Sequence, residues 1–282
     1  LFSSLPYWQE ESESRPTIKV SKEQKYTASI AIDRGWKVEI YVRSNSEINQ
    51  DDEFNKEGGY KNALSSAYFL ASNYLKNFYL FEALYSHAIK EEELSNVYQL
   101  KEIYLHDINS NTCKEYIKKL WEANYNAINV CNNIIAHCNS SQYDYAYKYG
   151  YSATIMKAFL YFNLINIWGD VPYTDKIHIE SLPITPVKTI LSYLITDLKR
   201  IEPLVPEKQA SDFNLLFTKY TVKALLAKIY LYQEDYSNAL KYAKEIINSK
   251  KFLLYENSSD IYIEENIYNN KESLNLLGAL FN

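Results

Sequence analysis

Residues 147–168 are the segment that most constrains what this chain can fold into. Their sequence, YKYGYSATIMKAFLYFNLINIW, is apolar on nearly every side when it is wound into a helix of about 3.6 residues per turn. A helix without a polar face has to be enclosed by other elements. The chain has 282 residues, of which 47% are apolar and 23% charged, and this is enough to enclose it. We therefore expect a globular protein with this helix buried.

Helical periodicity recurs on both sides of this segment. Residues 60–85 and 113–138 carry apolar side chains three or four positions apart, which predicts two long helices. Residues 187–201 repeat the pattern, with Thr185 as the expected N-cap and Pro186 at the first helical position. The stripes are Tyr116, Leu120, Ala123, Ala127, Val130 and Ile134 in one helix, and Val187, Ile190, Leu191, Leu194, Leu198 and Ile201 in another.

Residues 217–233 and 236–248 form a further predicted pair of helices, joined by the dipeptide ED. They fit the tetratricopeptide repeat, in which small side chains let two helices approach and aromatic ones fill the space between repeats. The matching positions are Leu226, Ala227, Tyr230, Tyr236, Ala239 and Ala243. Several helical pairs in succession predict a mostly α-helical fold, a tetratricopeptide-like solenoid of stacked pairs.

The N-terminal part of the chain has a different character. Residues 17–21, 26–32 and 36–44 mix β-branched and aromatic side chains in rough alternation, which predicts short strands. A polar break follows at residues 49–59. We therefore predict a strand-and-loop segment over residues 1–48 and an α-helical domain over residues 49–282.

The apolar helix ends in a short motif, WGDVP, that begins at Trp168. Gly169 can adopt the left-handed conformation that ends helices, Asp170 can bond to its own turn, and Pro172 prevents the helix from resuming. Taken alone, the motif is a helix stop. Further motifs follow it in a fixed order, namely Asp197-Leu198, Thr218-Lys219, ALLA at residues 224–227 and YSNA at residues 236–239.

This series resembles the SusD/RagB family, the nutrient-capturing surface lipoproteins of Bacteroidetes. In that family a hydrophobic helix runs into a Gly-Asp-Val-Pro turn, and the later motifs occur in the same order. Upstream, residues 52–68 look like the first helix of the family, and residues 120–133 resemble a later one. The resemblance covers roughly residues 50–280 and is strongest over residues 150–255.

The resemblance implies a SusD-like fold and a particular role. A family member is expected to lie at the cell surface on the outer membrane, to bind glycan, and to deliver it to a SusC-like TonB-dependent transporter. A peptide-binding, RagB-like role is the close variant. Members are usually longer and carry a lipidated N-terminal cysteine, so this chain looks like a short or truncated member. We expect membrane association only through such an anchor.

The composition argues against other classes of function. The net charge is −5 and the Lys and Arg residues are scattered, whereas nucleic-acid binding needs a concentrated basic face. No phosphate-binding loop and no G-x-S-x-G motif occurs. The four histidines and three cysteines lack metal-ligand spacing, so we expect no metal, no cofactor and no catalytic residue. No run of about 18 apolar residues predicts a transmembrane helix.

Binding is therefore the expected activity. A sugar presents apolar C–H faces and many hydroxyls, so its capture needs aromatic rings and hydrogen-bonding side chains. In the SusD/RagB family the ligand surface draws on loops after the first helix. By that resemblance we nominate Tyr85, Tyr98, Tyr104 and His106, in a region that also holds His87. Two alternatives stay open: a tetratricopeptide-type scaffold that binds a protein, and a small enzyme.

Overall fold

The structure is a computed structural model of the chain, and it separates into two compact units, Leu1–Lys56 and Glu57–Asn282. The predicted division after residue 48 stays a prediction. The strand expected at residues 17–21 and the nominated Tyr98 lie outside the described residues. The residues described are 26–32, 38–44, 54–90, 94, 100–176, 182–208, 216–252, 254 and 256–257.

The first unit contains an antiparallel pair of strands. Strand β1 (Tyr26–Ile32) pairs with β2 (Val38–Ser44) in a register that places Tyr26 opposite Ser44 and Ile32 opposite Val38. The alternation of β-branched and aromatic residues thus predicted strands correctly at these two places.

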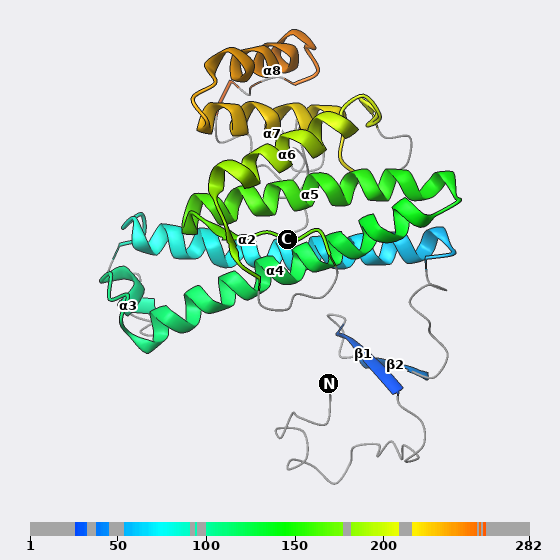
Figure 1. Cartoon of the computed structure of the whole chain (residues 1–282). Helices are drawn as coiled ribbons and strands as arrows, with labels where there is room; N and C mark the ends of the chain where they lie inside the picture. The colour runs from blue at the N-terminus through cyan, green and yellow to red at the C-terminus, as the bar shows by residue number, and fades with distance from the viewer. Residues whose placement is uncertain are drawn as a thin grey trace. The chain divides into compact units, whose positions relative to one another are not determined.

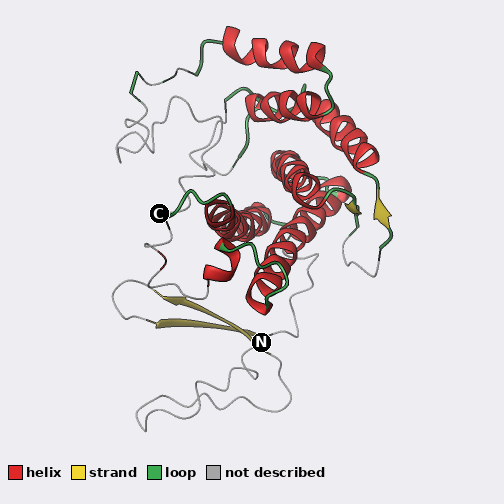
Figure 2. Ribbon diagram, turned by 90° about the vertical axis from the view of Figure 1, so that its left-hand side faces the viewer, coloured by secondary structure: helices red, strands yellow, loops and turns green. Residues whose placement is uncertain are grey.

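The second unit is built from helices. Consecutive long helices run in alternating directions, and the buried α5 packs against α2, α4, α6 and α7, while α7 packs against α8 (Figure 1). Among the described residues, strands are limited to two short pairs (Figure 2). The predicted mostly α-helical fold of stacked helical pairs is confirmed. Its elements are α2 (Glu57–Tyr85), α3 (Lys101–Tyr104), α4 (Asn111–Ser140), α5 (Asp144–Trp168), β3 (Val171–Pro172), β4 (Ile184–Thr185), α6 (Val187–Ile201), α7 (Lys219–Tyr232) and α8 (Tyr236–Asn248).

Helix α5 is enclosed as its composition predicts. Every residue from 152 to 158 is buried, which covers two full turns of the helix and therefore all of its faces. The helix ends at Gly169, whose φ of 72° lies in the left-handed region that glycine adopts without strain. Within the described residues, no helix is both long enough and apolar enough to cross a membrane.

The residues of the WGDVP motif hold three helices together. Asp170 accepts a hydrogen bond through Oδ1 from the backbone N–H of Val187, at 2.8 Å, and so caps the start of α6. Val171 is fully buried. The carbonyl oxygen of Pro172 accepts a hydrogen bond of 2.7 Å from the hydroxyl of Tyr125 on α4. The motif is therefore a tertiary junction between α4, α5 and α6 as well as a helix stop.

The expected start of α6 is wrong by one residue. Thr185 does not cap the helix, because it lies in β4, opposite Val171. Pro186 occupies the N-cap position with an extended backbone, and the helix begins at Val187. The cap comes from Asp170, which is distant in the sequence, and periodicity cannot reveal such a partner.

The tetratricopeptide-like pair is formed by α7 and α8. Tyr230 and Tyr242 are buried and stack with ring centroids 5.9 Å apart, and Ala239 is buried beside them. Tyr236 is 63% exposed, so its ring does not fill the space between the described helices, in contrast to the role expected from the repeat pattern.

Candidate functional site

Two Tyr-x-His sequences lie at the ends of α2 and α3. The first is Tyr85-Ser-His87 and the second is Tyr104-Leu-His106, and each tyrosine is the last residue of its helix. Both histidines have a left-handed backbone, with φ of 57° for His87 and 59° for His106. This region is uncommon for residues other than glycine, although Glu234 and Lys250 adopt it as well. We call Tyr85, His87, Tyr104 and His106 the Tyr-His cluster.

The cluster is held by a reciprocal pair of hydrogen bonds. Nε2 of His106 lies 2.7 Å from the carbonyl oxygen of Tyr85, and Nε2 of His87 lies 2.9 Å from that of Tyr104. A carbonyl oxygen can only accept, so Nε2 carries the proton and donates in both cases. In a neutral imidazole the remaining nitrogen, Nδ1, is then an acceptor.

The four rings form one continuous stack. Tyr85 and His106 have ring centroids 4.1 Å apart, His106 and His87 are 4.9 Å apart, and His87 and Tyr104 are 4.4 Å apart. The interplanar angles in that order are 26°, 12° and 37°. Because the inner rings cover one another's faces, they can offer a ligand mainly their edges, which carry polar atoms.

The stack rests on a small apolar cluster. Leu84 and Ile103, which directly precede the two tyrosines, are fully buried and pack with Leu94 and Cys113. The backbone that carries each tyrosine is therefore anchored from below. A site fixed in this way loses little conformational freedom when it binds a ligand.

The loop after α3 adds further chemistry next to the cluster. Leu105 and Ile108 are 59% and 55% exposed, so large apolar surfaces face the solvent beside the rings. Asp107 and Asn109 are exposed between and after them, and Oδ1 of Asp107 accepts a hydrogen bond of 3.2 Å from the backbone of Asn109. Apolar, aromatic and polar groups are thus side by side on one short surface segment.

The structure brings together three of the four nominated residues, Tyr85, Tyr104 and His106. It adds His87 as a full partner, while Tyr98 lies outside the described residues. Whether they bind a ligand stays a prediction. The repeated Tyr-x-His spacing was a signal in the sequence for their pairing, but only the tertiary structure shows which carbonyl each imidazole reaches.

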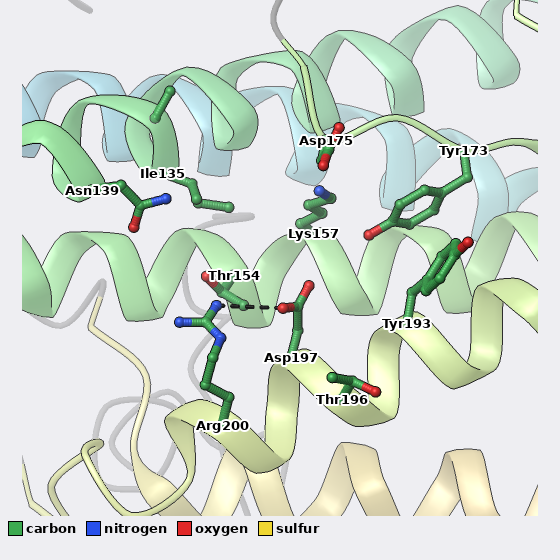
Figure 3. A pocket seen from close by; sticks show the side chains of 11 residues that line it. Ile135, Asn139, Thr154, Lys157, Tyr173, Asp175, Tyr193, Thr196, Asp197 and Arg200 are labelled. Atoms are coloured by element: carbon green, nitrogen blue, oxygen red, sulfur yellow. Dashed lines mark hydrogen bonds and ion pairs between the residues drawn. The ribbon is translucent and has the colours of Figure 1, made fainter.

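Sequence reasoning missed a second candidate site. A pocket of about 710 Å³ lies between α4, α5, α6 and the segment after β3, and its lining includes Lys157, Asp175 and Asp197 (Figure 3). The signal was Lys157, which is the one charged residue between positions 149 and 168 of the apolar helix. Among the residues that the structure describes, no three His, Cys, Asp or Glu side chains gather in a way that could hold a metal ion.

Stacked antiparallel helical pairs define an α-helical solenoid. A family model, SusD-like and described as starch-binding associating with outer membrane, matches residues 41–231. The chain therefore belongs to the SusD-like family, and the resemblance seen in the sequence is confirmed.

The similar proteins are longer than this chain. SusD-like protein P25 of Formosa agariphila is 25% identical over 166 residues, which cover 57% of this chain and 31% of P25. A SusD-like protein from Bacteroides fragilis has a TM-score of 0.50 at 21% identity, over 55% of this chain and 32% of that one. A laminarin-binding SusD-like protein has a TM-score of 0.51 at 22% identity, over 55% and 36%. This chain thus spans about a third of the length of these proteins, and the structures show the shared fold.

Proposed function

We propose that this protein binds glycan at the cell surface through the Tyr-His cluster and the adjoining loop. The observation that carries the proposal is the four-ring stack, anchored from below and bordered by exposed apolar and polar side chains. The description of its family as starch-binding and associated with the outer membrane supports the same function.

The mechanism we infer divides the work between apolar and polar groups. Sugar C–H faces pack on the exposed side chains of Leu105 and Ile108 and on the part of the half-buried Tyr104 ring that the apolar cluster leaves uncovered. Hydroxyls donate to Nδ1 of the imidazoles and to Asp107. Because the reciprocal hydrogen bonds hold the rings in place before binding, little side-chain entropy is lost on association.

We also propose that the protein does not transform its ligand. Each imidazole of the cluster donates Nε2–H to a backbone carbonyl, so neither Nε2 is placed to activate a Ser, Cys or Thr nucleophile. The captured glycan would pass to a SusC-like TonB-dependent transporter, with the protein attached to the outer membrane by an N-terminal lipid anchor. Co-purification from outer membranes tests this part. We expect the protein to co-purify with such a transporter, and to lose this association when it is released from its lipid anchor without detergent.

A second candidate function rests on α8. Tyr236, Leu240 and Ile247 of this helix are exposed, and such apolar side chains favour a scaffold that binds a protein or a peptide.

A peptide ligand that competes with glycan at the Tyr-His cluster would favour the RagB-like variant. Protein capture that depends on Leu240, without any glycan binding, would favour the scaffold.

Affinity electrophoresis in gels containing soluble starch or laminarin, followed by calorimetry, tests the glycan proposal. We expect retardation by at least one polysaccharide, and binding that is weaker by about twofold to tenfold for Tyr104→Ala and His106→Ala. The expected magnitude follows because one aromatic contact contributes about 0.5–1.5 kcal/mol and about 1.4 kcal/mol corresponds to a factor of ten.

Tyr236→Ala is the matched control, because Tyr236 is an exposed tyrosine on a different helix. Its binding should equal that of the wild type, and circular dichroism should show all variants folded. Unchanged affinity in both cluster variants would remove the cluster from the site. Retardation by no glycan would overturn the proposed function.

A further inference from the structure

The pocket beside α5 contains a largely buried cation, Lys157, whose ammonium group reaches the cavity. Lys157 is only 5% exposed, and its Nζ makes no hydrogen bond or ion pair with any residue drawn in Figure 3. The ammonium instead lies over the ring of Tyr173, 5.1 Å from the centroid, and is directed toward Asp175. Burial lowers the pKa of Lys157, while the nearby carboxylates of Asp197 and Asp175 oppose that shift.

An ammonium in this position destabilises the folded protein unless its N–H groups donate hydrogen bonds to an acceptor. Removing a charged group from water destabilises a protein when the lost hydration is not replaced by hydrogen bonds. Lys157 has three N–H donors at the wall of a cavity of about 710 Å³, which is within the range of roughly 300–1,000 Å³ typical of small-molecule sites. An oxygen-bearing ligand that enters the cavity can accept hydrogen bonds from this ammonium.

The charges around the cavity select the kind of ligand. Arg200 Nη2 lies 3.3 Å from Oδ1 of Asp197, and Asp175 balances Lys157, so the four groups sum to zero. A neutral ligand keeps this balance, whereas an anion would add charge beside two carboxylates. Carboxylates accept from hydroxyl groups and an ammonium donates to them, so both kinds of polar group in the pocket suit a polyol.

The remaining wall of the pocket is aromatic. The rings of Tyr173 and Tyr193 lie 5.0 Å apart and are tilted by 44°, and Tyr193 is 46% exposed. A partly exposed ring beside fixed hydrogen-bonding groups suits a ligand with an apolar C–H face and hydroxyls on its edges. We propose that this pocket is a second carbohydrate site, which takes one neutral sugar unit against Tyr193 with its hydroxyls on Lys157, Asp175 and Asp197.

This site shares no residue with the Tyr-His cluster, so it can be tested independently of the proposed function. The experiment is saturation-transfer NMR of the whole chain with D-glucose, D-galactose and D-mannose, each titrated separately, with D-glucuronate as an anionic comparator and glycine as a zwitterionic one. We expect weak binding of at least one neutral sugar. Lys157→Met should weaken it about tenfold or more, since it removes hydrogen bonds from a charged donor, and Tyr193→Ala should weaken it severalfold.

The variants separate binding from folding. Lys157→Met keeps most of the aliphatic stem. Asp175 is exposed and Asp197 pairs with Arg200, so neither carboxylate is left buried and unpaired, and the thermal midpoint should not fall. Lys148→Met, on the same helix but outside the pocket, is the matched control and should bind sugar like the wild type. His106→Ala should leave this binding intact even where polysaccharide capture is lost.

Three results would overturn the proposal. In the first, no neutral sugar binds, or Lys157→Met binds it unchanged. In the second, glucuronate or glycine binds more tightly than every neutral sugar, which would assign the pocket to a ligand with ionised groups, an anion or a zwitterion. In the third, the thermal midpoint of Lys157→Met falls along with binding, which would assign Lys157 a purely structural role.

Discussion

Gly150 allows α4 and α5 to approach closely. The stability lost when it is replaced by alanine should show how tightly the two helices pack. Gly150 is buried, and an added Cβ would lie 2.4 Å from Sγ and 2.9 Å from Cβ of Cys138 on α4. The thiol of Cys138 can rotate, but its Cβ is fixed to the backbone, so one helix must shift. Overpacking of this kind costs about 1–3 kcal/mol.

The gain from helix propensity opposes this cost. Alanine is favoured over glycine in a helix interior by up to about 1 kcal/mol. Gly58→Ala is therefore the matched control, because Gly58 is also helical but an added Cβ there meets nothing within 4 Å. Both variants receive some propensity gain, so the difference between them isolates the contact with Cys138. We expect Gly150→Ala to be less stable than Gly58→Ala by about 1–3 kcal/mol.

Urea unfolding followed by circular dichroism measures this difference. Adding Cys138→Ala to Gly150→Ala removes the closest contact but leaves the one to Cβ, so the double variant should be more stable than the sum of the single effects implies. If the Gly150→Ala variant were as stable as the Gly58→Ala variant, the close packing of α4 on α5 would be refuted. Because both helices line the Lys157 pocket, the same shift should also weaken sugar binding there.

Two further predictions test the junction and the start of α2. Asp170→Ala should lower the free energy of unfolding, measured by heat or urea, by about 1 kcal/mol, because the cap on Val187 is lost. Asp170→Asn should recover most of this stability. An Asp170→Ala variant as stable as the wild type would contradict the capping role. The hydrogen bond from Lys148 lowers the pKa of Glu57, which is half-exposed, so the pair contributes at most about 1 kcal/mol. This contribution is present above the ordinary carboxyl pKa and is lost as the pH falls through the lowered one. The stability difference between wild type and Glu57→Gln should therefore vanish in acid, and a difference that grew in acid would refute the pairing.

Much of the helical architecture follows from side-chain periodicity. The helices of the second unit other than α3 appear where apolar stripes recur, and α5 is buried because its sequence offers no polar face. What periodicity could not supply were contacts distant in sequence. The side chain that caps α6 comes from Asp170, and the exposure of Tyr236 depends on how α8 rotates against α7.

The candidate sites show the same division. The resemblance nominated Tyr85, Tyr104 and His106 in the region after the first long helix. The hydrogen bonds between them join chain segments about twenty residues apart, and the sequence alone could not show these bonds. The Lys157 pocket assembles side chains from α4, α5, α6 and the segment after β3. A lone lysine in an apolar helix was visible in the sequence, whereas the carboxylates and rings around it depend on the fold.

Hydrogen–deuterium exchange of the whole chain, with and without laminarin or soluble starch at saturating concentration, tests the central claim most directly. We predict slower exchange of backbone amides at residues 85–90 and 104–110 when the polysaccharide binds, with no change over 236–248. Bound polysaccharide that leaves the amides at residues 85–90 and 104–110 unaffected would contradict capture at the Tyr-His cluster.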